Sequence, residues 1–124
     1  MKYLYLDDLR KPGNSFEYTQ NRMYVEQNWH IVTSYEEFVD YFKSNGIPNI
    51  ISFDIDLTMY QARGLEDGEK DGIDCLLHLI EVCRQKKRQL PNCLIHSTNP
   101  ARKKEMLELI REGRELLKTM PLSI

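Results

Sequence analysis

Two apolar stretches of the chain end in aspartates. Residues 50–60 read IISFDIDLTMY, so Asp54 comes directly after a run that is apolar apart from one serine, and Asp56 follows after a single isoleucine. Near the start, Asp7 and Asp8 follow the run YLYL. A carboxylate buried without a partner costs several kcal/mol, so a metal ion, basic side chains or water must balance these charges. A hard cation such as Mg²⁺ suits this setting because it takes oxygen ligands and keeps waters that a phosphate can displace.

A third apolar stretch, NCLI, is followed by His96, Ser97 and Asn99. His96 fits a hydrogen-bonded core residue as well as it fits a general acid/base or a phosphate donor. The backbone amides after Ser97, at the start of the next predicted helix, form an anion site. Arg10 follows the first acid pair and offers a planar fork to phosphate oxygens. The alternative is that the aspartates are turn and cap residues that face water.

Periodicity and turn residues predict strands that alternate with helices. We expect strands over residues 2–8, 29–33, 49–56 and 92–98, with helices over 34–46, from 71 into the basic run 84–88, and over 99–117. This alternation implies parallel pairing through right-handed crossovers, and we expect an open sheet in the strand order 2-1-3-4. Ligands of such sheets bind at the carboxyl ends of the strands. The aspartates, His96 and Ser97 should therefore meet at one edge.

The segment from Leu57 onward holds a loop and a helix. The residues from Leu57 to Gly72 form a polar loop that is long enough to suggest a function. The apolar stripe predicted for the helix that follows consists of Ile73, Leu76, Leu77, Ile80 and Cys83. Basic residues from Arg84 to Arg88 suit the carboxyl end of that helix.

The composition fits a single domain spanning residues 1–124. The chain is 41% hydrophobic and 29% charged, and its net charge of −2 argues against bulk attraction to nucleic acid or membranes. No apolar run approaches the roughly 18 residues of a membrane span, and Asp7 comes too early for a signal peptide. Cys75 and Cys83 would lie too far apart on a helix for a disulfide. We therefore expect free thiols and a cytoplasmic location, while the oligomeric state is not indicated.

Segments covering most of the chain resemble the receiver-like family named for cyclic-phosphate processing. In chain order they read YLDDLRKP, ISFDIDL, DGIDCLLHL and IHSTNPARKKEM. Members of this family look like response-regulator receiver domains, with a three-layer flavodoxin-like fold and a shortened or replaced first helix. The resemblance implies that Asp7 and Asp8 match the receiver's metal-binding acids and that Asp54 matches its phosphoacceptor. It further implies that Ser97 or Thr98 matches the switching hydroxyl.

The chain departs from a receiver at its carboxyl end. A receiver has a fifth strand that bears a lysine, which neutralises the phosphoryl group. Here only KTMPLSI follows the bulk of the last predicted helix, and Lys118 falls at that helix's end. We therefore expect a missing or rudimentary fifth strand. This departure argues against phosphorelay.

A second resemblance concerns a shorter motif. The segment FDIDLT is similar to the DxDxT signature of haloacid-dehalogenase-type phosphatases. That resemblance implies that Asp54 is a nucleophile and Asp56 a general acid/base. In that family the DxD strand comes first in the domain, whereas here an acidic strand precedes it. Only a permuted, shortened version of that family would fit.

Three classes of function remain open. The first is a protein that hydrolyses or binds a cyclic phosphate or nucleotide with Mg²⁺ or Mn²⁺; the second is a receiver-like switch; the third is a non-catalytic interaction module. In the first class, the predicted metal ligands are Asp7, Asp8 and Asp54. The predicted catalytic residues are Asp54, Asp56 and His96. The predicted phosphate-binding residues are Arg10, Ser97 and Asn99.

Overall fold

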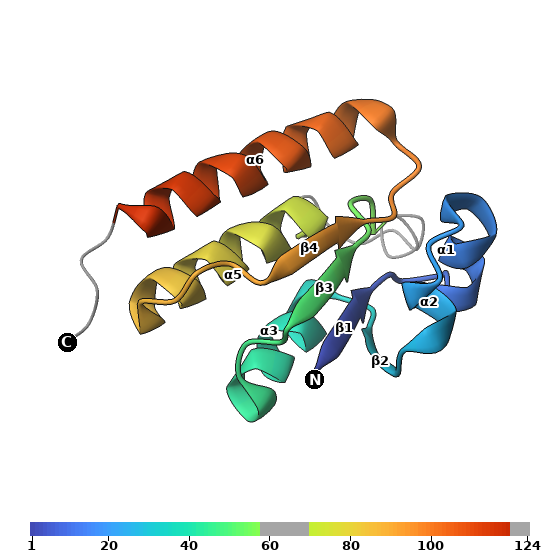
Figure 1. Ribbon diagram of the computed structural model, residues 1–124, viewed down its shortest axis with the longest axis horizontal. Helices are drawn as coiled ribbons and strands as arrows, with labels where there is room; N and C mark the ends of the chain where they lie inside the picture. The colour runs from blue at the N-terminus through green and yellow to red at the C-terminus, as the bar shows by residue number, and fades with distance from the viewer. Residues whose placement is uncertain (58–69, 120–124) are drawn as a thin grey trace.

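The computed structural model describes residues 1–57 and 70–119 (Figure 1). Its strands are β1 (Tyr3–Leu6), β2 (Trp29–Val32), β3 (Ile50–Phe53) and β4 (Asn92–Ile95). They pair in parallel in the order β2-β1-β3-β4. The predicted α/β fold and strand order are therefore confirmed.

Local sequence signals set the helix boundaries. The helices in the described residues are α1 (Pro12–Thr19), α2 (Met23–Glu26), α3 (Tyr35–Asn45), α5 (Gly72–Lys86) and α6 (Pro100–Lys118). Pro12 lies in the first turn of α1, where its missing N–H has no intrahelical partner to lose. Ser34 and Asn99 cap α3 and α6 by accepting from backbone amides of the first turn. The short α1 agrees with the shortened first helix that the resemblance implied.

The two faces of the sheet differ in chemistry. Because strand side chains alternate in direction, Leu4, Ile51 and Phe53 join the apolar core with residues of α3, α5 and α6. On the opposite face, Tyr5 and Ser52 meet the short helices α1 and α2 through hydrogen bonds and ring contacts. Figure 1 shows α1 and α2 together at one side of the sheet, near the carboxyl end of β1. A polar and aromatic layer thus lies directly beneath the edge where the aspartates were expected.

The apolar stripe of α5 differs from the prediction at Leu77, Cys75 and Leu79. Leu77 is 47% exposed, whereas Cys75 and Leu79 are fully buried. Neighbouring residues are about 100° apart around a helix. When Leu76 faces the sheet, Leu77 is therefore turned away from it, and Leu79 fills the next inward position.

Some predicted features fall outside the described residues. Most of the loop expected from Leu57 to Gly72 lies in the range 58–69, and the end of the chain lies in 120–124. Within residues 1–57 and 70–119 no strand follows α6, and Lys118 is its last residue. The helices of these ranges include none that is long and apolar enough to span a membrane. Cys75, Cys83 and Cys93 are free thiols, as expected.

Candidate functional site

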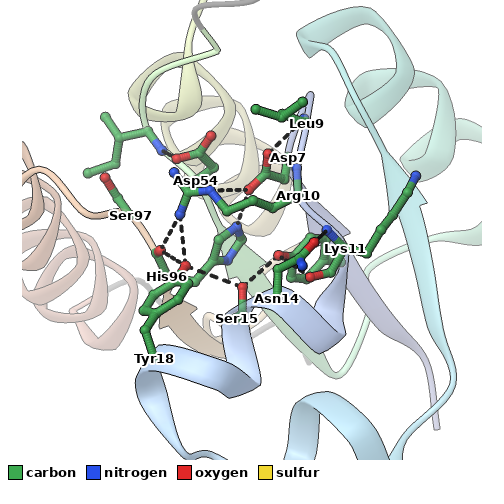
Figure 2. Close-up of polar contacts among 12 residues, drawn as sticks. Asp7, Leu9, Arg10, Lys11, Asn14, Ser15, Tyr18, Asp54, His96 and Ser97 are labelled. Atoms are coloured by element: carbon green, nitrogen blue, oxygen red, sulfur yellow. Dashed lines mark hydrogen bonds and ion pairs between the residues drawn. The ribbon is translucent and has the colours of Figure 1, made fainter.

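The carboxyl ends of β1, β3 and β4 bring Asp7, Asp54 and His96 to one edge of the sheet (Figure 2). The backbone N–H of each residue donates to a carbonyl of the neighbouring strand, over distances of 2.9–3.1 Å. The three positions thus extend the ladder by one residue beyond the strands. The sheet itself therefore determines where the three side chains begin.

Asp7, Asp8 and Asp54 form the acidic cluster. Each contributes a carboxylate oxygen, and these oxygens lie within 4.8 Å of one another. Asp7 is 1% exposed and Asp54 is 3% exposed, while Asp8 is partly exposed. Carboxylates held this close repel one another, and burial strengthens the repulsion because little water screens it.

The Asp7 carboxylate has several donors. Its Oδ1 accepts from the amides of Leu9 and Arg10 at 2.9 and 2.8 Å, and its Oδ2 lies 3.0 Å from His96 Nε2. Burial would raise the pKa of Asp7, but the hydrogen bond from His96 and those from the two amides lower it below its ordinary value. Asp7 is therefore held as an anion.

The pKa of the Asp54 carboxyl moves in the opposite direction. Within residues 1–57 and 70–119, its side chain accepts a hydrogen bond from the amide of Ile55 at 2.9 Å. Burial, and then the negative charge of Asp7, raise the pKa of Asp54 to about 7. The nearby Arg10 acts in the other direction but does not outweigh these effects. Asp54 is therefore held less firmly as an anion than Asp7 is, although the two carboxylates are neighbours.

Gly72 explains how α5 begins so close to Asp54. A Cβ atom at this position would lie 2.0 Å from the backbone carbonyl oxygen of Asp54, well inside contact distance. The amide of Gly72 donates to Ile55 O at 2.8 Å, and Asp71 caps the helix through the amides of its first turn. The Asp-Gly pair at the start of this helix is thus needed to pack α5 against the end of β3.

Arg10 lies across the edge of the sheet between α1 and β4. Its Nη1 donates to Tyr18 Oη at 2.8 Å and to the backbone oxygen of His96 at 3.3 Å. Its Nε lies 3.7 Å from Asp7 Oδ2. Tyr18 itself donates to the His96 backbone oxygen. As Figure 2 shows, these contacts hold the guanidinium next to the acidic cluster.

His96 is buried, with 1% of its surface exposed. Its Nε2 faces Asp7, and its Nδ1 lies 2.7 Å from Ser52 Oγ. Burial lowers the pKa of His96, although Asp7 acts against this effect. In this structure both ring nitrogens are bonded to protein side chains, so the catalytic role of His96 stays a prediction.

Asp56 and Asn99 belong to a neighbouring polar group rather than to the acidic cluster. Asp56 is 3.2 Å from Arg102 Nη1 and accepts from Asn99 Nδ2 at 3.1 Å. Asp71 pairs with the same guanidinium at 2.7 Å. Ser97, which is nearly buried, accepts from the amide of Asn99 at 3.2 Å. Asp56 is therefore balanced by a basic side chain.

Sequence reasoning did not identify Tyr18, Tyr24, Ser52 or Arg102 as site residues. Ser52 had a signal, since it is the one hydroxyl within the apolar run of its strand. The other three lie in segments whose composition is ordinary for helices. Their importance follows from contacts between residues that are distant in the sequence.

Comparison with protein families found a match over most of the chain. The family model described as "Cyclic-phosphate processing Receiver domain" matches residues 2–112. No curated protein and no solved structure matches the chain. The matched range includes β1 to β4 and the polar residues of the site.

Proposed function

Because the chain belongs to the family of cyclic-phosphate processing receiver domains, we propose that it binds and hydrolyses a cyclic phosphate or cyclic nucleotide at the carboxyl edge of its sheet. The observation that carries this proposal is the acidic cluster next to one guanidinium. Asp7, Asp8 and Asp54 offer oxygens within 4.8 Å, and Arg10 lies beside them. This combination suits a divalent cation together with an anionic ligand.

The donor set fits Mg²⁺ or Mn²⁺. All three groups are carboxylates, the kind of oxygen ligand that these cations prefer. Burial and the negative charge of Asp7 raise the pKa of Asp54 to about 7, and a bound cation would offset the repulsion between these carboxylates. In the proposal, Asp8 and Asp54 hold the cation, and Asp7, whose oxygens already accept several hydrogen bonds, supports it. A bound cation would supply charge stabilisation at the phosphoryl oxygens and a more acidic water.

The phosphoryl group would be held from two sides. Arg10 can turn its planar guanidinium toward two oxygens of the phosphate. Ser97 and the amino end of α6 lie at the end of β4 and present a hydroxyl and backbone dipoles of the sign that favours anions. The role of Asn99 would be indirect, because its side chain caps α6 and bonds Asp56.

Ring opening also requires a proton for the leaving oxygen. His96 and Asp56 are the residues predicted for this step. His96 is bonded to Asp7 and Ser52, and Asp56 to Arg102 and Asn99. A direct proton-transfer role for His96 predicts that His96→Ala slows turnover by roughly 10²–10⁴-fold with little change in cation affinity.

The direct test is hydrolysis of 2′,3′-cyclic and 3′,5′-cyclic nucleotides with Mg²⁺ or Mn²⁺, followed by chromatography of the products. We expect turnover of at least one substrate, and we expect Asp54→Asn to abolish it. Asp40→Asn is the matched control, since Asp40 is an exposed aspartate of α3. Absence of turnover and of binding for every cyclic phosphate would refute the proposed function.

A receiver-like switch is the second candidate, because the resemblance to receiver domains matches Asp54 to their phosphoacceptor. The described residues place no lysine of a fifth strand beside the acidic cluster, and Lys118 pairs with Glu115 at the end of α6. We therefore expect no durable acyl phosphate after incubation with acetyl phosphate and Mg²⁺. A stoichiometric adduct at Asp54, detected by mass spectrometry, would favour the switch over the enzyme.

A further inference from the structure

A buried chain of hydrogen bonds leads from the acidic cluster into the layer beneath the sheet. His96 Nε2 lies 3.0 Å from Asp7 Oδ2, and His96 Nδ1 lies 2.7 Å from Ser52 Oγ. Ser52 Oγ lies 2.6 Å from the hydroxyl of Tyr24. All four side chains are almost completely buried. The chain joins the end of β1 to β4, β3 and α2.

The order Asp7, His96, Ser52 is that of a hydrolase triad, but its serine has no access to a substrate. Ser52 is 0% exposed and lies within β3, and its Oγ is covered by Tyr24. A nucleophile must reach an electrophilic atom, so Ser52 cannot act as one. The buried hydrogen-bond chain therefore has a role other than nucleophilic catalysis.

The donor and acceptor roles of these side chains give the hydrogen-bond chain one consistent direction. Asp7 Oδ1 already accepts from two backbone amides, so the carboxylate acts as an acceptor and His96 Nε2 donates to Oδ2. The hydroxyl of Tyr24 has no hydrogen bond other than that with Ser52 among residues 1–57 and 70–119. A buried hydroxyl needs an acceptor, so Tyr24 donates to Ser52, and Ser52 donates to His96 Nδ1.

Packing holds the imidazole in this orientation. The ring of Tyr5 stacks on His96 with centroids 4.4 Å apart and an interplanar angle of 4°. The ring of Tyr24 meets it edge-on, at 6.2 Å and 84°. With one face and one edge covered, the imidazole ring can flip and swap the positions of its two nitrogens only by displacing aromatic side chains.

We propose that Tyr24, Ser52 and His96 are positioning residues that fix the Asp7 carboxylate beside Asp8 and Asp54 and thereby set the cation affinity of the acidic cluster. Ser52 holds His96 as the tautomer with hydrogen on Nε2, and that hydrogen holds Asp7 Oδ2. This inference rests on the cation site of the proposed function. This positioning role differs from direct proton transfer by His96 in one measurable respect. If the role is correct, loss of the hydrogen-bond chain weakens cation binding itself.

The first experiment needs no cation. In metal-free, ¹⁵N-labelled protein, long-range ¹H–¹⁵N spectra report which ring nitrogen of His96 is protonated, with His96→Gln identifying the signals. We expect hydrogen on Nε2 alone, with a sharp signal protected from exchange, and we expect that signal to broaden in Ser52→Ala. A doubly protonated ring, hydrogen on Nδ1, or an unchanged signal in Ser52→Ala would overturn the proposal.

The second experiment measures Mn²⁺ affinity by calorimetry or electron paramagnetic resonance. Outer-shell partners of metal ligands commonly change affinity by about 10–100-fold, so we expect a loss of that size in Ser52→Ala and a smaller loss in Tyr24→Phe. Tyr41→Phe is the matched control, since it removes a hydroxyl from a buried tyrosine of α3 whose ring contacts His30 and Phe42 rather than the hydrogen-bond chain. We expect this control to bind Mn²⁺ as the wild type does.

The two experiments separate failure of this inference from failure of the proposed function. If Ser52→Ala binds Mn²⁺ as tightly as the wild type, the positioning role is wrong while the cation site stands. If the wild type binds no Mn²⁺, the cation site is wrong, and so is the proposed effect of the hydrogen-bond chain on cation affinity. The protonated nitrogen of His96 then shows separately whether the hydrogen-bond chain orients Asp7.

Discussion

Asp7 and Asp54 are neighbouring buried aspartates whose pKa values move in opposite directions. Burial acts on both, but Asp7 accepts hydrogen bonds from His96 and two amides, which lower its pKa. Asp54 gains less from hydrogen bonds, so burial and the charge of Asp7 raise its pKa to about 7. One residue therefore supplies a fixed charge, and the other gains its charge near neutral pH.

This difference predicts how stability depends on pH without divalent cations. The pKa of Asp54 is about 7 in the folded protein and 3.8 in a free side chain, so between these values the folded state binds more protons. Its contribution to stability is complete below about pH 4 and is lost as the pH rises through 7. Asp54→Asn cannot ionise, and we expect it to exceed the wild type in stability at pH 8 by about 1–2 kcal/mol.

Thermal melting in the presence of a chelator measures this difference. The advantage of Asp54→Asn should shrink as the pH is lowered toward 4, where the wild-type carboxyl is protonated. Asp40→Asn, at an exposed position, should show no such pH dependence. An Asp54→Asn variant that is less stable than the wild type by the same amount at both pH values would contradict the assignment.

At the scale of secondary-structure elements, Arg102 connects three parts of the fold next to the acidic cluster. It lies in the first turns of α6 and pairs with Asp56, which follows β3, at 3.2 Å. It also pairs with Asp71, the N-cap of α5, at 2.7 Å. Asp56 precedes residues 58–69 and Asp71 follows them, so one guanidinium links both flanks of that segment to α6.

We expect Arg102→Ala to destabilise the protein by about 1–2 kcal/mol, because a network of partly buried pairs is worth more than an isolated surface pair. Part of this loss arises because Asp56 and Asp71 would both lose their contact with the same guanidinium. Urea unfolding provides the measurement, and Lys104→Ala, on an exposed part of the same helix, is the control. Equal stability of the two variants would show that the network contributes nothing.

At the scale of the whole molecule, cation binding and folding should be linked. The acidic cluster draws its oxygens from two strand ends that lie far apart in the sequence, so it exists only in the folded chain. A cation that binds only the folded state stabilises it by about 2.7 kcal/mol at a concentration of 100 times its Kd. We expect millimolar Mg²⁺ or Mn²⁺ to raise the melting temperature by several degrees.

The same measurement on Asp54→Asn tests the ligand set. The substitution should remove most of the cation-dependent shift, even though it stabilises the metal-free protein at high pH. A wild-type melting temperature that does not respond to millimolar Mg²⁺ or Mn²⁺ would mean that the acidic cluster is not a cation site.

Features that depend on neighbouring residues could be predicted from the sequence alone. The alternation of strands and helices and the strand order follow from periodicity and connection rules. Because the carboxyl ends of parallel strands share one edge, the meeting of Asp7, Asp54 and His96 followed from the same pattern.

The partner of each polar side chain was decided only by the tertiary structure. Asp7 and His96 are 89 positions apart, Tyr24 and Ser52 are 28 apart, and Asp56 and Arg102 are 46 apart. A periodic pattern tells which face of an element is buried, but it does not tell which rotamer or which neighbour satisfies a polar atom. The sequence placed His96 near the acids. Only the pairing of β3 with β4 placed Ser52 behind His96, and only the packing of α2 placed Tyr24 behind Ser52. A buried polar atom takes whichever partner the fold brings within reach.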